Sequence, residues 1–399
     1  TTKVLQSFAS FAVKKFKQNF FKNHNHLKKL FILFITIFCC LQLYAQHTYV
    51  FFGSFNREKE TEGIYVYELN RQNGKLSKIA SVSGISNPSF LTLSPDGKYL
   101  FACTESKTKN GGSVSSFEFN PDKKSLQFIS KQNSGGENPV YLTVHPSGKW
   151  LINGNYTEGS VSVYPISENG TLEPSVQNIP FSEGSVNPDR QDRAHIHSTV
   201  FSPDSDYLFL PDLGADKIRA YRFNNEKDTP LQEAEIPFIK TTLGAGPRHF
   251  TFHPNGKFAY CIEEIGGAVS VYAYKNGNLK PLQRIFTHPE TCKGDFESSD
   301  VHLSPDGKFL YASNRGKENN IAIFSIQDDG SLKTIGYQSV KGKHPRTFNL
   351  DPSGQFLITA NTATSNVTVF KRNPETGLLK KAGRKIKIRN VSNVQFRRY

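Results

Sequence analysis

One short pattern recurs six times in this chain and limits the folds that it can adopt. Each copy places a turn between two apolar half-strands, in which proline presets φ and, in most copies, glycine supplies a positive φ. The copies are LSPDGKYL from Leu93, VHPSGKWL from Val144, FSPDSDYL from Phe201, FHPNGKFA from Phe252, LSPDGKFL from Leu303 and LDPSGQFL from Leu350. Their prolines are 51, 57, 51, 51 and 47 residues apart. Such a period is typical of solenoids and propellers.

A second pattern, an alternating strand that is usually followed by a turn and a leucine, has a similar period. Its seven copies are GIYVYEL from Gly63, SVSSFEF from Ser113, SVSVYPI from Ser160, KIRAYRF from Lys217, AVSVYAY from Ala268, NIAIFSI from Asn320 and NVTVFKR from Asn366. Alternation with Asn-Gly or Asp-Gly turns indicates hairpins. Together the two patterns predict four-stranded antiparallel blades of about 50 residues, and therefore an all-β, seven-bladed β-propeller.

The first unit begins at Thr48, already in its second strand, so its innermost strand must come from elsewhere. The C-terminal segment 391–396, VSNVQF, has no blade of its own. We expect it to complete the first blade, because closure removes the open sheet edge. The single tryptophan, Trp150, and the absence of Gly-His with Trp-Asp pairs exclude a WD40 array.

Residues 1–45 do not fit the repeat. Lysines precede an apolar run, 30–43, and Leu43-Tyr44-Ala45 ends in a small residue. This order predicts a signal peptide that is cleaved after Ala45 and leaves 46–399 as the propeller domain. A membrane anchor is the alternative, but the run is short of the roughly 20 residues that span a bilayer. We therefore expect a periplasmic or secreted protein with no membrane association after cleavage.

The basic charge of the whole chain comes largely from this segment. It holds seven of the 49 Lys and Arg residues and no acid, which leaves 42 basic against 35 acidic residues. The high pI is therefore no argument for a nucleic-acid partner. Beyond the segment only Cys103, Cys261 and Cys292 remain, and the first two sit in strand patterns, so a disulfide scaffold is not indicated.

Positions along the channel can be counted from the turn prolines. The first strand of a blade lines the channel and the proline turn lies at one end, so residues equally far before and after it meet at the other end. Six residues before the prolines stand Ser89, Val140, His197, Arg248, Ser299 and Arg346. Ten residues after them stand Glu105, Tyr156, Leu213, Glu264, Arg315 and Thr362. We expect these columns to form a polar ring at one mouth of the channel.

Charged groups that converge on a concave site must pair with one another or bind something, because unpaired buried charge is costly. They could also be solvated, since channel mouths are wet. Arg248, Arg315 and Arg346 suit an anionic substrate or a developing oxyanion. Glu264 and His197 are candidate acid/base groups, and nearby arginines would keep Glu264 ionised.

The longest spacing contains NPDRQDRAHIH, residues 187–197, which should overhang the same mouth as a substrate lid or simply be a solvated loop. It supplies Arg190 and His195 to the candidate site. His195 and His197 would share one face of a strand, but no third metal ligand follows. A metal site is therefore not predicted.

Several segments resemble the seven-bladed lactonase family, which includes bacterial 6-phosphogluconolactonase and fungal carboxy-muconate lactonising enzyme. They are GPRHF from Gly246, NPDRQDRAHIHS from Asn187, SPDGKFLYASNRG from Ser304 and HPRTFNLDPSGQFLITAN from His344, and the resemblance covers 47–399. The family's proposed site is a histidine, two arginines and a glutamate. The resemblance assigns these to His197, Arg248, Arg315 and Glu264.

The resemblance implies a lactone hydrolase, similar to 6-phosphogluconolactonase, that needs no cofactor and no metal. Its substrate would be a small sugar-acid lactone, which we expect to be anionic and, outside the cytoplasm, unphosphorylated. We expect the substrate to be bound by Arg346, Glu105, Tyr156, His195 and Arg190. A non-catalytic binding propeller and a muconate-type cycloisomerase remain alternatives. The sequence indicates no oligomeric state.

Overall fold

The computed structural model describes residues 46–399, apart from 57, 107 and 109–110. The chain divides into two units, Thr1–His47 and Thr48–Tyr399, and only the second is considered below. The predicted signal peptide, 1–45, lies outside the described residues. Within the described part of the chain, no helix has the length and apolar character needed to cross a membrane.

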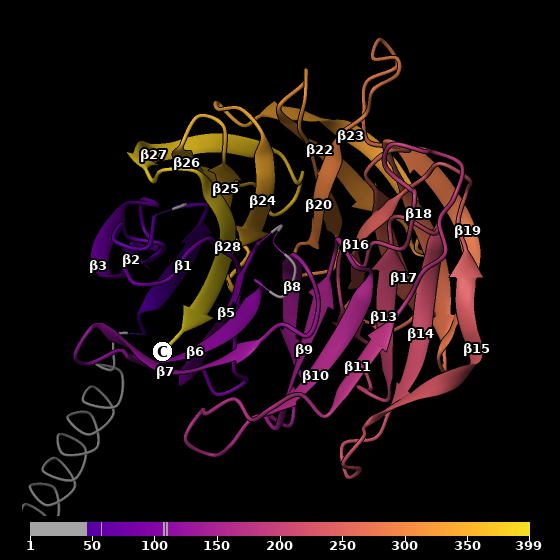
Figure 1. Cartoon of the computed structure of the whole chain (residues 1–399). Helices are drawn as coiled ribbons and strands as arrows, with labels where there is room; N and C mark the ends of the chain where they lie inside the picture. The colour runs from indigo at the N-terminus through magenta and orange to yellow at the C-terminus, as the bar shows by residue number, and fades with distance from the viewer. Residues whose placement is uncertain (1–45, 57, 107, 109–110) are drawn as a thin grey trace, which may run out of the picture. The chain divides into compact units, whose positions relative to one another are not determined.

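Residues Thr48–Tyr399 form seven sheets of four antiparallel strands, arranged in a ring (Figure 1). From the channel outward, blade 1 contains β28 (Val391–Arg398), β1 (Thr48–Ser54), β2 (Ile64–Leu69) and β3 (Leu76–Val82). Blade 2 contains β4 (Pro88–Leu93), β5 (Tyr99–Thr104), β6 (Ser113–Asn120) and β7 (Ser125–Asn133). Blade 3 contains β8 (Pro139–Val144), β9 (Trp150–Asn155), β10 (Ser160–Pro165) and β11 (Gln177–Pro180).

The remaining blades repeat this order. Blade 4 contains β12 (Val200–Phe201), β13 (Tyr207–Asp212), β14 (Lys217–Phe223) and β15 (Leu231–Lys240). Blade 5 contains β16 (Pro247–Phe252), β17 (Phe258–Glu263), β18 (Ala268–Lys275) and β19 (Asn278–Phe286). Blade 6 contains β20 (Ser298–Leu303), β21 (Phe309–Asn314), β22 (Asn320–Ile326) and β23 (Leu332–Ser339). Blade 7 contains β24 (Pro345–Leu350), β25 (Phe356–Asn361), β26 (Asn366–Arg372) and β27 (Leu379–Lys387). The predicted seven-bladed propeller is therefore confirmed.

The C-terminal strand closes the ring, as predicted. β28 pairs antiparallel with β1 from Thr48↔Arg398 to Gly53↔Asn393. It also contacts the innermost strands of its two neighbours, β24 and β4. Asn393 Oδ1 accepts a hydrogen bond from the Leu91 amide at 3.1 Å, which ties the closing strand to blade 2. β28 thus supplies the innermost strand of blade 1.

The hydrophobic core lies between the blades. Each strand alternates, so its apolar side chains pack against the blade on either side. Seven buried clusters occupy the seven contacts between neighbouring blades. The cluster between blades 7 and 1 contains Phe356 and Val394, for example, and so depends on the closing strand. Cys103 and Cys261 are buried free thiols, as their strand patterns predicted.

The repeated proline turns adopt the expected conformation. In the copy at Pro305, the Gly307 amide donates to the Ser304 carbonyl at 2.9 Å, and Gly307 has φ +69°. Asp306 Oδ1 accepts the Lys308 amide, two residues on, at 3.1 Å. The copy at Pro203 differs, because Ser205 takes the glycine position with φ +65°. These turns place every inner hairpin in the same register.

Candidate active site

A β-bulge in the innermost strands presents one column of the candidate residues. In β16, Pro247 pairs with Glu263 and His249 pairs with Ile262, so Arg248 is the extra residue. A shift of the same kind occurs in β4, β8, β20 and β24, around Ser89, Val140, Ser299 and Arg346. A bulge re-aims the side chain of the extra residue. Five of the six residues counted six before the prolines, all except His197, are therefore set apart by the backbone itself.

The second column meets the first at the predicted end of the channel. The amide of Glu264 donates to the Gly246 carbonyl at 2.8 Å, and the amide of Arg315 donates to the Glu297 carbonyl at 2.9 Å. All six residues that stand ten after a turn proline make this bond. In each case the acceptor is the carbonyl of the residue that stands eight before the same proline. Gly246 has φ +62°, and a Cβ there would lie 2.9 Å from Ile265. The predicted convergence of the two columns is confirmed.

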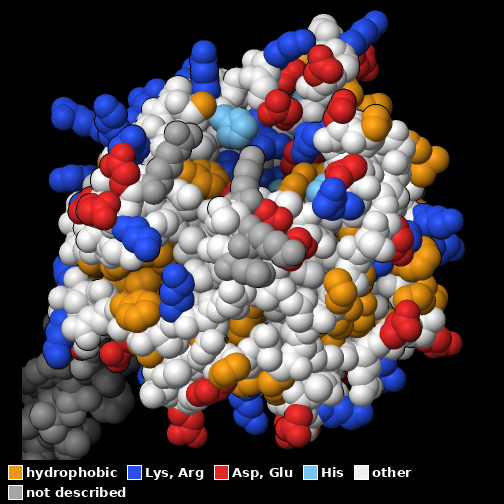
Figure 2. Space-filling model, in the orientation of Figure 1, with side chains coloured by type: hydrophobic (Ala, Val, Ile, Leu, Met, Phe, Trp, Pro, Cys, Tyr) orange, Lys and Arg blue, Asp and Glu red, His pale blue; other side chains and the backbone are white. Residues whose placement is uncertain are grey.

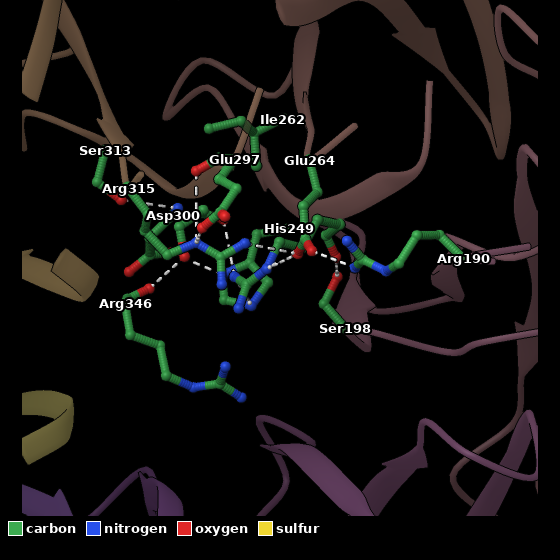
Figure 3. A network of polar contacts seen from close by, with 12 residues as sticks. Arg190, Ser198, His249, Ile262, Glu264, Glu297, Asp300, Ser313, Arg315 and Arg346 are labelled. Atoms are coloured by element: carbon green, nitrogen blue, oxygen red, sulfur yellow. Dashed lines mark hydrogen bonds and ion pairs between the residues drawn. The ribbon is translucent and has the colours of Figure 1, made fainter. Parts of the chain in front are cut away.

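The Glu264 carboxylate lies at the centre of a group of three arginines. Its Oε2 accepts Arg248 Nε at 2.7 Å and Arg315 Nη2 at 3.1 Å, and its Oε1 accepts Arg190 Nη2 at 2.5 Å. The side chains of Glu264, Arg248 and Arg315 are 6 %, 1 % and 7 % exposed. Figure 3 shows the contacts that join Arg190 to Glu264. One buried carboxylate thus holds three guanidinium groups from separate parts of the chain.

The charge state of Glu264 follows from these neighbours. Burial raises the pKa of its carboxyl, but the charges of Arg315 and Arg248 outweigh burial and hold the pKa well below its usual range. The carboxylate is therefore ionised at neutral pH and has little tendency to take a proton. Its position suits the alignment of the arginines better than proton transfer.

His197 differs from Glu264 in having no ring partner. Among the described residues, neither ring nitrogen makes a hydrogen bond, and Nδ1 is fully buried. Burial and the charge of Arg248 lower the pKa of His197 well below its ordinary value. The ring is therefore neutral at pH 7, and Nε2, the nitrogen that is not fully buried, is free to bind a ligand or a water.

His195 and Tyr156 pack beside His197. The Tyr156 ring stacks on His195 with centroids 4.3 Å apart, and it meets His197 edge to face at 5.3 Å. His195 Nδ1 lies 2.7 Å from the Tyr156 carbonyl oxygen, so it donates that hydrogen bond. Burial and the Glu264 charge raise the pKa of the Tyr156 phenol, which is therefore neutral. These aromatic rings form one wall beside the arginine group.

The loop that carries Arg190 is anchored to the propeller. Gln191 is 1 % exposed, and its Nε2 donates to the Leu213 carbonyl at 2.9 Å. Asn187 Oδ1 accepts the Arg190 amide at 3.2 Å. Asp189, by contrast, is exposed, as a solvated loop residue would be. The loop overhangs the mouth as expected and presents Arg190 from a fixed base.

Arg346 and Glu105 form a separate pair in the mouth. Their side chains, from blades 7 and 2, are 3.4 Å apart, and Arg346 lies over the Phe55 ring at 5.3 Å. In Figure 3 Arg346 extends away from the Glu264 group. A cavity of about 900 Å³ opens beside this pair, lined in part by Phe55, Asn87, Glu105 and Asn138. In the upper part of Figure 2, basic and histidine side chains lie in a hollow of the surface.

The two columns missed other polar residues of the mouth. Five residues before the prolines stand His249 and Asp300, both buried, and eight before stand Glu297 and His344. Burial and the charges of Arg315 and Arg346 lower the pKa of His344 to about 4. Counting these two further columns would have found all four. Among the described residues, no group of three or more His, Cys, Asp or Glu is arranged to hold a metal ion.

Comparison with known proteins shows what this chain is similar to. Residues 49–396 match the profile of a family described as lactonase, 7-bladed β-propeller. The chain is 41 % identical to a 6-phosphogluconolactonase of Formosa agariphila, over 88 % of this chain and 99 % of that protein. It is 31 % identical to the 6-phosphogluconolactonase of Bacillus subtilis, over 80 % of this chain and 90 % of that one. The structure of the periplasmic gluconolactonase of Pseudomonas aeruginosa aligns with a TM-score of 0.82 and 35 % identity, covering 88 % of this chain and 99 % of that chain.

Proposed function

This chain belongs to the seven-bladed β-propeller lactonases, and we propose that the group around Glu264 and His197 is where it hydrolyses its lactone. The family and its named relatives identify a lactone hydrolase. The observation that carries the assignment to this mouth is an unpartnered, neutral imidazole beside arginines fixed on one carboxylate. The imidazole can accept a proton, and the arginines can bind an oxyanion.

In the proposed reaction, His197 takes a proton from the attacking water as its oxygen bonds to the lactone carbonyl carbon. The tetrahedral intermediate then loses the ring oxygen, and the protonated imidazole returns the proton to the leaving alkoxide. The product is the open hydroxy acid. Because the pKa of His197 is lowered, its protonated form is a strong enough acid to protonate the alkoxide readily.

Arg248 and Arg315 stabilise the oxyanion in this proposal. Preorganised donors in a buried site stabilise developing charge strongly, because they need not reorganise during the reaction. Arg248 Nη2 has no hydrogen-bond partner among the described residues, so its donors are available to a substrate. Glu264 keeps the two guanidinium groups in place instead of moving protons. This role differs from the acid/base role that the sequence suggested for Glu264.

For the substrate, we propose an unphosphorylated sugar-acid lactone. Arg190, Arg248 and Arg315 face Glu264, and Arg346 faces Glu105. These two carboxylates offset only two of the four guanidinium charges, so the mouth stays positive and suits an anionic group or a developing oxyanion. Tyr156, His195 and the Arg346–Glu105 pair would contact the sugar hydroxyls. The similar periplasmic protein of Pseudomonas aeruginosa is named a gluconolactonase, which supports the same choice.

We propose a periplasmic location for the propeller, with residues 1–45 acting as a cleaved signal peptide. The proposal follows from the charge and apolar pattern of that segment. The similarity to a periplasmic gluconolactonase supports it. Fractionation of the native host, with N-terminal sequencing of the mature protein, tests it. A mature chain that begins near Gln46 is expected, and recovery of residues 1–45 on the mature protein contradicts cleavage.

The central experiment measures hydrolysis by purified residues 46–399. Gluconolactone and its 6-phosphate are assayed with correction for spontaneous opening. We expect kcat/KM to be higher for gluconolactone. His197→Asn should lower kcat by roughly 10²- to 10⁴-fold, the usual contribution of a general acid–base group. His253→Asn is the matched control, because His253 lies at the other end of the inner hairpin.

Three outcomes of this experiment would oppose the proposal. No rate above background on a panel of lactones would favour a propeller that only binds its ligand. An absorbance change with carboxy-muconate in the absence of lactone hydrolysis would favour cycloisomerisation. An unchanged rate in His197→Asn would show that hydrolysis does not take place at this site.

A further inference from the structure

Arg248 determines the protonation of its neighbour His249. Arg248 Nη1 lies 2.9 Å from His249 Nε2 and 2.8 Å from the Ser299 carbonyl oxygen. A guanidinium group has donors only, so His249 Nε2 must accept and carries no proton. The proton of the neutral ring is therefore on Nδ1. A second proton on Nε2 would place two N–H groups against each other.

Asp300 completes the arrangement from the other side of the ring. Its Oδ1 lies 2.7 Å from His249 Nδ1, the nitrogen that must donate, and its Oδ2 lies 3.1 Å from His302 Nε2. The same carboxylate accepts the amides of Val301 and Phe348 at 3.0 and 3.1 Å. Asp300 is 3 % exposed. With four donors around it, the carboxylate is fixed in place and holds His249 in one tautomer.

We propose that His249 and Asp300 are positioning residues for the lactonase reaction, with Asp300 acting through His249 to fix the Arg248 guanidinium. The inference rests on the role proposed above for Arg248 in binding the oxyanion. Glu264 holds Nε, while Ser299 and His249 hold Nη1, which leaves Nη2 for the substrate. Loss of the acceptor at His249 would allow the Arg248 guanidinium to rotate. Figure 3 shows Asp300 and His249 beside the Glu264 group.

The environment of His249 supports this reading. Its ring lies 5.3 Å from the His197 ring and 5.2 Å from the Tyr141 ring, both edge to face. Burial and the Arg248 charge lower the pKa of His249 to about 4, although Asp300 opposes the shift. Asp300 stays ionised, since the nearby His302 and His249 outweigh the effect of its burial on its pKa. His249 is therefore a neutral acceptor for Arg248 throughout the working pH range.

A purely structural role is the competing explanation, since Asp300 joins β20 to β16 and β24. Two substitutions of His249 separate the explanations. Gln places its carbonyl oxygen near the position of Nε2 and can still accept from Arg248. Asn places its amide near the position of Nδ1, so it can donate to Asp300 but leaves Arg248 without its acceptor. Both remove the ring and should disturb packing to a similar extent.

We expect His249→Asn to lower kcat about 100-fold, the effect of a small displacement of a catalytic group, with KM nearly unchanged. His249→Gln should stay within about tenfold of the wild type. Asp300→Asn should resemble His249→Asn, because the new amide can donate to Nδ1 and so favours the wrong tautomer. Equal losses in His249→Asn and His249→Gln, in proportion to their melting temperatures, would overturn the proposal.

A measurement of the tautomer is independent of activity. In protein labelled with ¹⁵N-histidine, the His249 signals, assigned by their loss in His249→Gln, should show a proton on Nδ1 in the wild type and on Nε2 in Asp300→Asn. A proton on Nε2 in the wild type would refute the inference. If the wild type has the expected tautomer but no lactonase activity, the proposed function fails instead.

Discussion

The Glu264 carboxylate binds two buried arginines, Arg248 and Arg315, and the partly exposed Arg190, so its removal affects more than one bond. We expect Glu264→Gln to lower the free energy of unfolding by about 3–5 kcal/mol, because breaking a buried ion pair leaves charges uncompensated. Glu297→Gln is the control, since the Glu297 side chain is 45 % exposed and 4.0 Å from Arg315. It should change stability by less than about 0.5 kcal/mol. Denaturant titration measures both.

The pairing of Glu264 with Arg190 can be tested by combining substitutions. If the carboxylate aligns the arginines, Glu264→Gln and Arg190→Gln should be less than additive in stability, because the second change removes one of the uncompensated charges. Simple additivity would contradict the arrangement. If Glu264→Gln abolished activity without loss of stability, the acid/base role suggested by the sequence would be favoured instead.

Individual residues of the site were predictable where the repeat fixes the backbone. Arg248 was found because a bulge recurs at its position, and Glu264 because the same amide bond follows every inner hairpin. The pairing of Arg346 with Glu105, two other members of the ring, was not predictable. Arg346 meets Glu105 across 241 residues, and only the closed ring brings them together. His249 was missed because it is one residue beyond the column that was counted.

At the scale of the turn, one repeat departs from the others. Ser205 has φ +65° where other copies have glycine, a conformation that costs most L-residues roughly 1–2 kcal/mol. We expect Ser205→Gly to raise the free energy of unfolding by about 0.5–1 kcal/mol, after the entropy cost of glycine. Thermal and denaturant unfolding measure the change.

The reverse substitution at another copy is the control. In Gly307→Ser the new Cβ would lie 2.9 Å from the His253 ring, at a φ of +69°. This variant should lose stability by more than about 1 kcal/mol. A Ser205→Gly variant that is no more stable than the wild type would show that the serine side chain offsets its backbone strain.

The strand elements themselves were predictable in number and order, because two patterns of similar period specify one hairpin each. Blade 4 shows the limit. Its innermost strand is reduced to Val200–Phe201, with an isolated bridge between Ile196 and Asp212. The hydrogen bonds of this segment go partly to side chains, as when Asp212 Oδ1 accepts the His195 amide at 2.8 Å. Periodicity does not report such side-chain bonds.

For the whole propeller, the buried neutral histidines predict a loss of stability in acid. In the unfolded chain an imidazole binds a proton near pH 6.5, whereas His249 and His344 do so only near pH 4 when folded. The unfolded chain therefore holds more protons between these values, and stability falls as the pH drops through this window. His249 alone accounts for about 3 kcal/mol at most.

Thermal unfolding between pH 4.5 and 7.5 checks this prediction. The melting temperature should be highest near neutrality and decline steadily below pH 6.5. His249→Gln removes one of the titrating groups and should reduce the slope. A melting temperature that does not change down to pH 4.5 would mean that these histidines are protonated in the folded protein.

Closure of blade 1 by β28 has a consequence for the order of events during biosynthesis. The partners of β1 in this ladder, Val391–Arg398, follow every other strand of the propeller in sequence, so the ribosome adds them after those strands. Until they emerge, β1 lacks its inner neighbour and the cluster between blades 7 and 1 lacks Val391 and Val394. Pairings this distant in sequence form slowly. The propeller ring therefore stays open at blade 1 until β28 has been synthesised.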